Sequence, residues 1–310
     1  EWPLILALSA GLLVPIASHA ALLGFEFLLT FQRGRRVPLP DHAERLELGG
    51  LLKAWLTEVP TAIRVFGIQM PWTGHQPLAS AEKPARMPIV LIHGYFCNRA
   101  LFRQLAHHLA RRGHPVESVN LEPVFGSIDQ YPELIAKSVA RAIHASGHDK
   151  VALIGHSMGG IAARAYLRDF GQSHVARVIT LGAPHHGTEL ARIGHTKIVR
   201  QLRPNNPWLN KLARDEPADR YHLFTVILSE HDNIVTPQRA QTLPGARTIG
   251  IRGLGHVDLA CHPAVFQLIN VALEADNTDN GSTQAGLRAS APNRLPPATA
   301  QKRCIKKIHS

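Results

Sequence analysis

One serine in this 310-residue chain has the sequence context of an activated nucleophile. Ser157 is the centre of a Gly-His-Ser-Met-Gly run at 155–159, which follows the apolar run 151–154 and precedes a helical pattern. A sharp strand-to-helix turn strains the serine backbone, and side chains two residues to either side would collide, so glycine fits both places. A helix that begins just after the serine also points free N–H groups toward a developing oxyanion. The run therefore predicts nucleophilic catalysis by Ser157, with the N–H of Met158 as one oxyanion donor.

A second oxyanion donor is expected where the first core strand ends. A His-Gly-Tyr run at 93–95 follows the apolar run 89–92, and the backbone N–H of Tyr95 is the candidate. Two donors aimed at a developing negative charge are worth about 3 kcal/mol each in a water-poor site. The alternative is an ordinary turn in which Gly94 only permits the bend.

A serine nucleophile needs a base, and the 19 histidines make closeness in sequence uninformative. Chain order is more useful, because one known order of such triads is nucleophile, acid and then base. Asp232 follows a late apolar run, and His256 lies in the loop before the last helical pattern. His256 would take the Ser157 proton and return it to the leaving group, while Asp232 would hold the imidazole tautomer. The alternative interpretation makes both of them loop residues, with Asp258 or Glu230 as the acid.

The elements that position these residues alternate between short apolar runs and helical patterns. Such alternation implies crossover connections and a mostly parallel sheet with helices on both faces, an α/β fold. The strands are expected at 89–92, 116–121, 151–154, 175–181, 223–228 and 248–251, and the helices at 100–112, 131–145, 161–170 and 264–273.

Taken together, these motifs resemble the bacterial lipases and related carboxylesterases of the α/β-hydrolase superfamily. A Gly-Ala-Pro-His-His-Gly run at 182–187 is also similar to a loop of these lipases. The resemblance covers residues 87–275 and implies the α/β-hydrolase fold, with a triad of Ser157, Asp232 and His256. It implies that the 182–187 loop forms a wall of the site and gives its histidines no catalytic role.

Two departures from the family pattern concern a metal and the substrate-binding loops. Asp258 stands where related calcium-dependent lipases have a ligand, but no upstream carboxylate partner is evident, and calcium needs several oxygen ligands. We therefore predict no metal and no cofactor. The long insertion 187–220 is a candidate lid, and the segment 121–131 is a candidate rim of an acyl pocket.

The N-terminal segment predicts a membrane anchor. Residues 2–25 contain no Asp, Glu, Lys or Arg, and as a helix they would be about 36 Å long, enough to cross a bilayer core. A cleaved signal peptide is the alternative. Arg33, Arg35 and Arg36 follow and favour the cytoplasmic side, although orientation depends on both flanks, so the side is left open.

An amphipathic helix is expected next, with polar residues such as Lys53 and Glu58 between its apolar positions and an end or kink at Pro60. We expect it to pack on the domain rather than lie in a bilayer interface. Its apolar positions are Leu48, Leu51, Leu52, Trp55, Leu56, Val59 and Ile63.

The predicted organisation along the chain has four parts. Residues 1–36 are a transmembrane anchor with a basic flank, and 37–86 are the amphipathic helix and a linker. Residues 87–275 are the catalytic domain, and 276–310 are a disordered basic tail.

Composition limits the classes of function. The chain has 34 Lys and Arg against 23 Asp and Glu, a net charge of +11, which fits a membrane surface. It has no zinc-ligand spacing, P-loop or aromatic-interleaved basic stripe, so nucleic acid is not an expected partner. The expected partners are a membrane and a small lipid or ester substrate, with the oligomeric state left open.

The expected reaction is ester hydrolysis; the alternatives are an acyltransferase or thioesterase with the same triad, or a non-catalytic binding protein.

Overall fold

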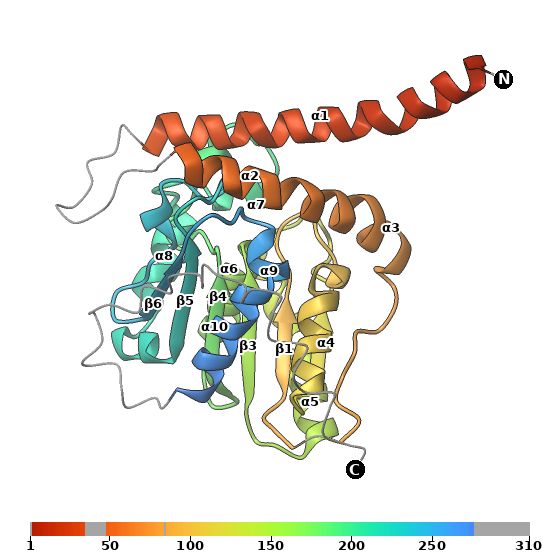
Figure 1. The fold of residues 1–310 in the computed structure, drawn as a ribbon. Helices are drawn as coiled ribbons and strands as arrows, with labels where there is room; N and C mark the ends of the chain where they lie inside the picture. The colour runs from red at the N-terminus through yellow and green to blue at the C-terminus, as the bar shows by residue number, and fades with distance from the viewer. Residues whose placement is uncertain (1, 35–47, 84, 276–310) are drawn as a thin grey trace, which may run out of the picture.

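The computed structural model describes residues 2–34, 48–83 and 85–275, so the predicted disordered tail and part of the basic flank lie outside it. At its centre is a six-stranded sheet in the order β2-β1-β3-β4-β5-β6, in which every neighbouring pair is parallel (Figure 1). The strands are β1 (Ile89–Ile92), β2 (Val116–Val119), β3 (Val151–His156), β4 (Val175–Leu181), β5 (Phe224–Ser229) and β6 (Arg247–Ile251).

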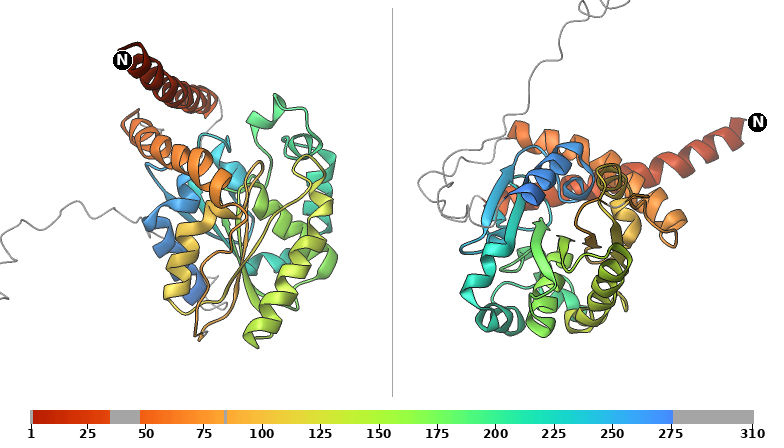
Figure 2. Two further views of the ribbon diagram at one scale, coloured as in Figure 1. Left: turned by 90° about the vertical axis from the view of Figure 1, so that its right-hand side faces the viewer. Right: turned by 90° about the horizontal axis from the view of Figure 1, so that it is seen from below.

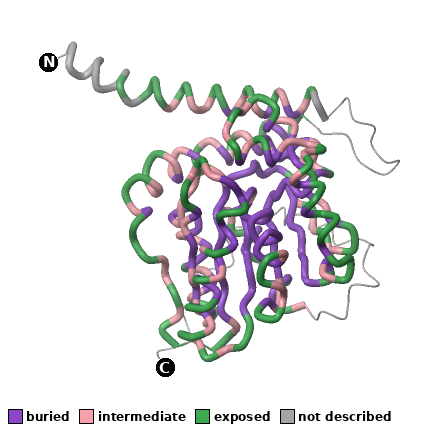
Figure 3. The backbone as a smooth tube through the Cα atoms, turned by 180° about the vertical axis from the view of Figure 1, so that it is seen from behind, coloured by how far each residue is buried: buried purple, intermediate pink, exposed green. Residues whose placement is uncertain are grey.

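Both faces of the sheet are covered, which is why the central strands are continuous apolar runs. Ile89 and Leu91 of β1 face α4 (Arg103–Arg111) and α10 (Pro263–Glu274). The alternate residues Val90 and Ile92 face α5 (Pro132–Ser146) and α6 (Met158–Phe170). Figure 3 shows the strands as the buried centre of the fold, and Figure 2 shows the helices on either side. The predicted parallel sheet with helices on both faces is confirmed.

Two N-terminal helices lie across the end of the sheet (Figure 1). Helix α1 spans Trp2–Gly34 and helix α2 spans Leu48–Ala62. They pack together through a small apolar cluster, and the Trp55 indole N–H donates to the carbonyl of Ala20 at 2.9 Å. The cluster consists of Phe27, Leu51 and Ala54, with Phe31 and Trp55 at its edge.

The structure differs from two expectations about this segment. The α-helix ends at Ala62, two residues after Pro60, but the helical segment continues as a π-helix over Ile63–Gln69 and as α3 over Met70–Thr73, into the predicted linker. Ala62 and Val65 are fully buried on either side of this junction, and such tertiary packing offsets the one backbone hydrogen bond that proline removes.

The second correction concerns the face that α2 buries. Leu48, Leu52 and Leu56 are 57 to 70% exposed, whereas Glu58 is fully buried on the side that also buries Leu51. Periodicity alone placed Glu58 on the polar face, but the contacts of α2 with loops of the sheet decide the orientation.

Helix α1 is long and apolar enough to cross a bilayer core, over Leu13–Gln32, by length and composition. A signal sequence near an N-terminus passes the same test. The C-terminal part of this stretch packs on the domain, because Leu23, Phe27 and Thr30 are buried.

Candidate active site

Ser157 lies in the turn between β3 and α6, with φ 55° and ψ −127°. This is a conformation that residues with a side chain rarely adopt, and it costs about 1–3 kcal/mol unless the surroundings enforce it. The surroundings include two backbone hydrogen bonds, from the Ser157 N–H to Leu181 at 2.8 Å and from Gly160 to the Ser157 carbonyl at 3.0 Å. The serine is therefore held in the strained turn that the sequence predicts.

The two glycines around the serine allow close approach of neighbouring backbone. A Cβ at Gly155 would lie 2.6 Å from the N atom of Gly160, and one at Gly159 would lie 2.1 Å from the carbonyl oxygen of Ile92. Neither position has room for a side chain, because helix α6 starts directly against the end of β1. The structure thus shows the predicted collision that excludes side chains two residues before and after Ser157.

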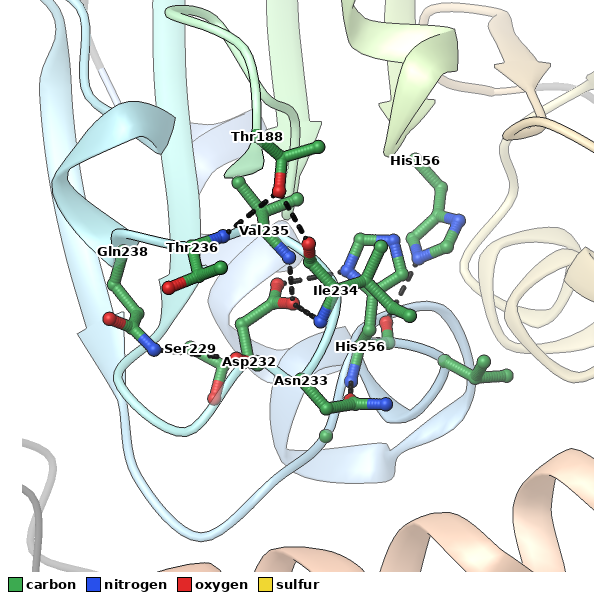
Figure 4. Close-up of polar contacts among 12 residues, drawn as sticks. His156, Thr188, Ser229, Asp232, Asn233, Ile234, Val235, Thr236, Gln238 and His256 are labelled. Atoms are coloured by element: carbon green, nitrogen blue, oxygen red, sulfur yellow. Dashed lines mark hydrogen bonds and ion pairs between the residues drawn. The ribbon is translucent and has the colours of Figure 1, made fainter. Parts of the chain in front are cut away.

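The predicted acid and base are in direct contact. Nδ1 of His256 lies 2.9 Å from Oδ2 of Asp232, and the side chains are 6% and 0% exposed (Figure 4). The other carboxylate oxygen accepts the N–H groups of Ile234 at 2.8 Å and Val235 at 2.7 Å. Both oxygens of Asp232 are thus fixed, one of them on the imidazole.

The two alternative acids have other partners. Glu230 pairs with Arg252 at the surface at 2.5 Å, and Asp258 accepts the N–H of Gly255 at 3.4 Å. Of the three carboxylates considered from the sequence, Asp232 is the one that contacts His256.

His156, which had no predicted role, forms a hydrogen bond with the backbone of His256, the predicted base. Its Nε2 lies 2.9 Å from the carbonyl oxygen of His256, and the two ring centroids are 4.7 Å apart (Figure 4). Burial, and then the neighbouring His256, lower the pKa of His156 to about 3, so the ring is neutral at pH 7 and Nε2 must carry the proton that it donates. The N–H of His256 in turn donates to Oδ1 of Asn233 at 3.0 Å.

The nucleophile and the base come from adjoining loops. Ser157 follows His156 in the chain, and His156 contacts His256. Within the described residues, however, no hydrogen bond joins the Ser157 hydroxyl to His256. Contacts of this kind are often long in ligand-free enzymes and tighten when substrate binds. The structure therefore brings the acid and base together and leaves the hydrogen bond between serine and base unmade.

The two candidate oxyanion donors border the nucleophile. Met158 is the first residue of α6, so its N–H lies outside the helical hydrogen-bond ladder. A Cβ at Gly94 would lie 2.9 Å from the Cβ of Ser157, which places the turn that carries Tyr95 against the serine. This turn is fixed by His93, another residue without a predicted role.

His93 is almost fully buried, and burial lowers its pKa to about 4, so it is neutral at pH 7. Its Nε2 accepts the N–H of Leu121 at 3.0 Å, so the proton is on Nδ1, which donates to the carbonyl of Gly94 at 2.9 Å. His93 thereby ties the Tyr95 turn to the chain that follows β2.

Three aromatic side chains gather beside this turn. Tyr95, Phe96 and Phe125 form an aromatic trio with ring centroids 6.2 to 6.4 Å apart. Phe96 is 63% exposed and Phe125 is 59% exposed, and Phe125 lies in the segment expected to form the acyl rim. The trio presents apolar surface next to a candidate oxyanion donor.

A buried ion pair fixes the wall on the other side of the nucleophile helix. Arg164 of α6 donates to both carboxylate oxygens of Glu216, which follows α8 (Pro207–Asp215), and Tyr221 donates to the same carboxylate at 2.8 Å. The Arg164 guanidinium also donates to the carbonyl of His185 at 3.1 Å. His185 is buried against Thr180, with 3.1 Å between Nε2 and Oγ1. The candidate lid is thus joined to the 182–187 loop through Arg164.

The two N-terminal helices contact the loops that carry the acid and the base. Thr30 of α1 donates to the carbonyl of Asn233 at 3.1 Å, and the Asn233 amide donates to Glu26 at 2.9 Å. Glu58 of α2 contacts the backbone just after His256. Residues of the predicted anchor and of the predicted amphipathic helix therefore belong to the surroundings of the site.

The described residues contain no group of three or more His, Cys, Asp or Glu arranged to hold a metal ion. Cys97 and Cys261 are free, and burial raises the pKa of each thiol to about 12, so neither carries charge near neutral pH. Cys304 lies outside the described residues.

Comparison with known proteins agrees with the fold. Residues 87–194 match the family model described as alpha/beta hydrolase fold. The chain is 32% identical over 148 residues to a triacylglycerol lipase of Burkholderia plantarii, covering 44% of this chain and 40% of that protein. It is 27% identical over 141 residues to the lysosomal thioesterase PPT2 of Bos taurus, covering 42% of this chain and 43% of that protein. The matches thus span about two-fifths of the length of these curated relatives.

The solved structure of the mature Bacillus licheniformis lipase BlEst2 has the same fold. Its TM-score is 0.55 at 20% identity, and the match covers 64% of this chain and 96% of that one. The chain therefore has the α/β-hydrolase fold and is similar to bacterial lipases and esterases.

Proposed function

We propose that the chain is a serine hydrolase that cleaves carboxylic esters. The observation that carries the proposal is the 2.9 Å contact between Asp232 and His256, beside a serine in a strained strand-to-helix turn. In this fold such a turn exposes the nucleophile at the end of the sheet. The lipases among the similar proteins support the same reaction class.

The first half of the proposed reaction forms an acyl-enzyme. The Ser157 hydroxyl attacks the ester carbonyl carbon while Nε2 of His256 takes its proton. The N–H groups of Met158 and Tyr95 stabilise the resulting oxyanion. Collapse of the tetrahedral intermediate breaks the bond to the alcohol, which leaves with the proton from His256. Asp232 keeps the other imidazole proton on Nδ1 and stabilises the imidazolium.

The second half releases the acid. His256 takes a proton from water, and the hydroxide formed attacks the acyl carbon of the Ser157 ester. The proton then returns from His256 to the serine oxygen, and the carboxylic acid leaves. The aromatic trio offers the acyl chain an apolar surface beside the oxyanion donors.

A thioesterase or acyltransferase reaction is the second candidate, since both use the same acyl-enzyme. The similarity to a lysosomal thioesterase favours testing thioesters. The purified full chain in detergent is incubated with nitrophenyl esters and acyl-thioesters of two to sixteen carbons, with and without a primary alcohol. We expect free carboxylic acid from esters and, in Ser157→Ala, turnover that is lower by on the order of 10⁴-fold or more. Predominant transfer to the alcohol would identify an acyltransferase, and failure on every substrate would contradict the proposal.

We also propose that α1 anchors the enzyme in a membrane, on the basis of its length and apolar composition. The chain should remain in the membrane fraction after a high-salt wash and be released by detergent. Release by salt alone would instead indicate adsorption through the net charge of +11, because salt screens such attraction.

A further inference from the structure

We propose that Glu58, outside the triad, is a positioning residue for His256, so that helix α2 is a working part of the active site. This inference rests on the proposed function, because it assigns a role around the base of that reaction. Glu58 is separated from His256 by almost two hundred residues and comes from a segment outside the predicted catalytic domain 87–275.

The carboxylate of Glu58 binds the backbone directly after the base. Oε1 accepts the N–H of Val257 at 2.7 Å, and Oε2 accepts the N–H of Asp258 at 2.9 Å. Glu58 is fully buried, so these contacts are shielded from water. Since Val257 is bonded to His256, a shift of this carboxylate would move the backbone that carries the imidazole.

Helix α2 is fitted closely to both loops of the acid–base pair. A Cβ at Gly255 would lie 2.5 Å from the carboxylate carbon of Glu58, so only glycine leaves room for Glu58 at this point. Near the start of α2, a Cβ at Gly50 would lie 2.2 Å from Nε2 of His231, which precedes Asp232 in the chain. Helix α2 therefore packs against the loop that carries Asp232 and against the loop that carries His256.

The chemistry of the contact requires a carboxylate. Two adjacent N–H groups need two acceptors, and a carboxylate supplies both, whereas a glutamine supplies one acceptor and turns an NH₂ group toward the other donor. Burial and the nearby Asp258 raise the pKa of Glu58 well above its usual range, so the fold keeps this group at an electrostatic cost. An apolar residue would pack α2 without that cost.

With Glu58, the backbone of the base is held at three successive points. The N–H of His256 is bound by Asn233, its carbonyl by His156, and the two N–H groups that follow by Glu58. The side chain is bound by Asp232. Displacing a catalytic group by about 1 Å can cost about 10²-fold in rate.

The test measures kcat and KM of the detergent-solubilised full chain on a short-chain ester, with kcat expressed per serine labelled to completion by a fluorophosphonate probe. We expect Glu58→Gln to lower kcat about 10- to 100-fold and to leave KM within about twofold, because the contact acts on the base and not on substrate binding. Thr57→Ala is the matched control on α2, since this hydroxyl bonds only carbonyls of its own helix, and it should change neither constant.

A second variant separates the contact from the charge and covers the case in which Glu58→Gln does not fold. Gly255→Ala keeps the carboxylate but places a methyl group against it, so we expect a similar fall in kcat. In the double variant the two changes break one contact, so the loss should not exceed the larger single loss by more than about twofold.

A kcat per labelled serine that stays within about twofold of the wild type in the folded variants would overturn the proposal and leave Glu58 a structural role. A change confined to KM would also overturn it. A wild-type chain that neither binds the probe nor hydrolyses any ester would contradict the proposed function itself, whatever the variants do.

Discussion

The two sides of the candidate site are built differently. The acid–base loops, residues 229–236 and 253–258, are mostly buried, and their side chains and backbone are fixed by hydrogen bonds from the ends of β5 and β3 and from α2. In the aromatic trio the three rings contact one another, and two of the three side chains are more than half exposed. One side therefore has a fixed geometry and the other an accessible apolar surface.

This difference matches two tasks in ester cleavage. Proton transfer depends on distances of about 3 Å and on one tautomer, so it needs fixed polar groups. Binding an acyl chain depends on apolar area, which tolerates movement. We therefore expect changes in the acid–base loops to act on kcat and changes in the trio to act on KM.

Asp232→Asn should give the largest effect in this comparison. The amide no longer stabilises the imidazolium and favours the wrong tautomer, so kcat should fall about 10⁴-fold with little change in KM. Glu230→Gln is the control, because this nearby carboxylate pairs with Arg252 at the surface. Steady-state kinetics with a short-chain ester would decide, and equal losses in both variants would contradict the assignment of the acid.

Arg164→Met should test whether the buried polar contacts beside the nucleophile helix also fix the fold. The change leaves Glu216 buried without its cation, which costs about 3–5 kcal/mol in the free energy of unfolding. Adding Glu216→Gln should recover part of that loss, because the uncompensated charge is removed. Urea unfolding of the wild type and the two variants measures this loss, and a double variant less stable than Arg164→Met would contradict the prediction.

Buried histidines around the site should also make the fold sensitive to acid. Burial lowers the pKa of His93 and His231 to about 4 and that of His156 to about 3, from an ordinary 6.5. Below pH 6.5 the unfolded chain binds more protons than the folded one, so the free energy of unfolding falls as pH falls and is level above 6.5. His93 and His156 should each contribute a loss of about 2 kcal/mol between pH 7.5 and pH 5, and the less deeply buried His231 should contribute less, because solvent screens it.

Urea unfolding at pH 7.5 and pH 5 measures this loss. Replacing His231 by Gln should make the dependence on pH shallower. A free energy of unfolding that is equal at both pH values would show that these histidines are not held neutral by the fold.

Phe96→Ala and Phe125→Ala should have the smallest effect and the most selective one. Each removes exposed apolar surface of the aromatic trio, so KM should rise about 3- to 10-fold for long-chain esters and stay nearly constant for acetyl esters. Phe170→Ala is the control, because this half-exposed ring stacks on Tyr166 at the end of α6. A fall in kcat with unchanged KM would contradict the assignment of substrate binding to the aromatic trio.

Local patterns predicted the nucleophile turn well. The glycines around Ser157 and the apolar run before it are short-range features with one steric explanation, and the structure shows the strained φ that they imply. The parallel sheet followed from the alternation of elements, and the loops for Asp232 and His256 followed from chain order.

Contacts between distant segments could not be predicted in this way. The Glu58 contact joins residues 199 positions apart, and the Thr30 contact joins residues 203 positions apart. A helical period says which residues share a face but not which face meets the domain, so Glu58 was assigned to the polar side. His156 stands at a variable position of its motif, and only the folded loops bring it to the carbonyl of His256.

The central claim is that Ser157 is the nucleophile, and covalent labelling tests it most directly. The full chain and its Ser157→Ala variant, both shown to be folded by thermal unfolding, are incubated with a fluorophosphonate probe, and the modified residue is located by peptide mass spectrometry. We predict one labelled site at Ser157, no labelling of the variant, and a fall in ester turnover on the order of 10⁴-fold or more. Comparable labelling of Ser157→Ala would contradict the account, because another serine would then be the nucleophile.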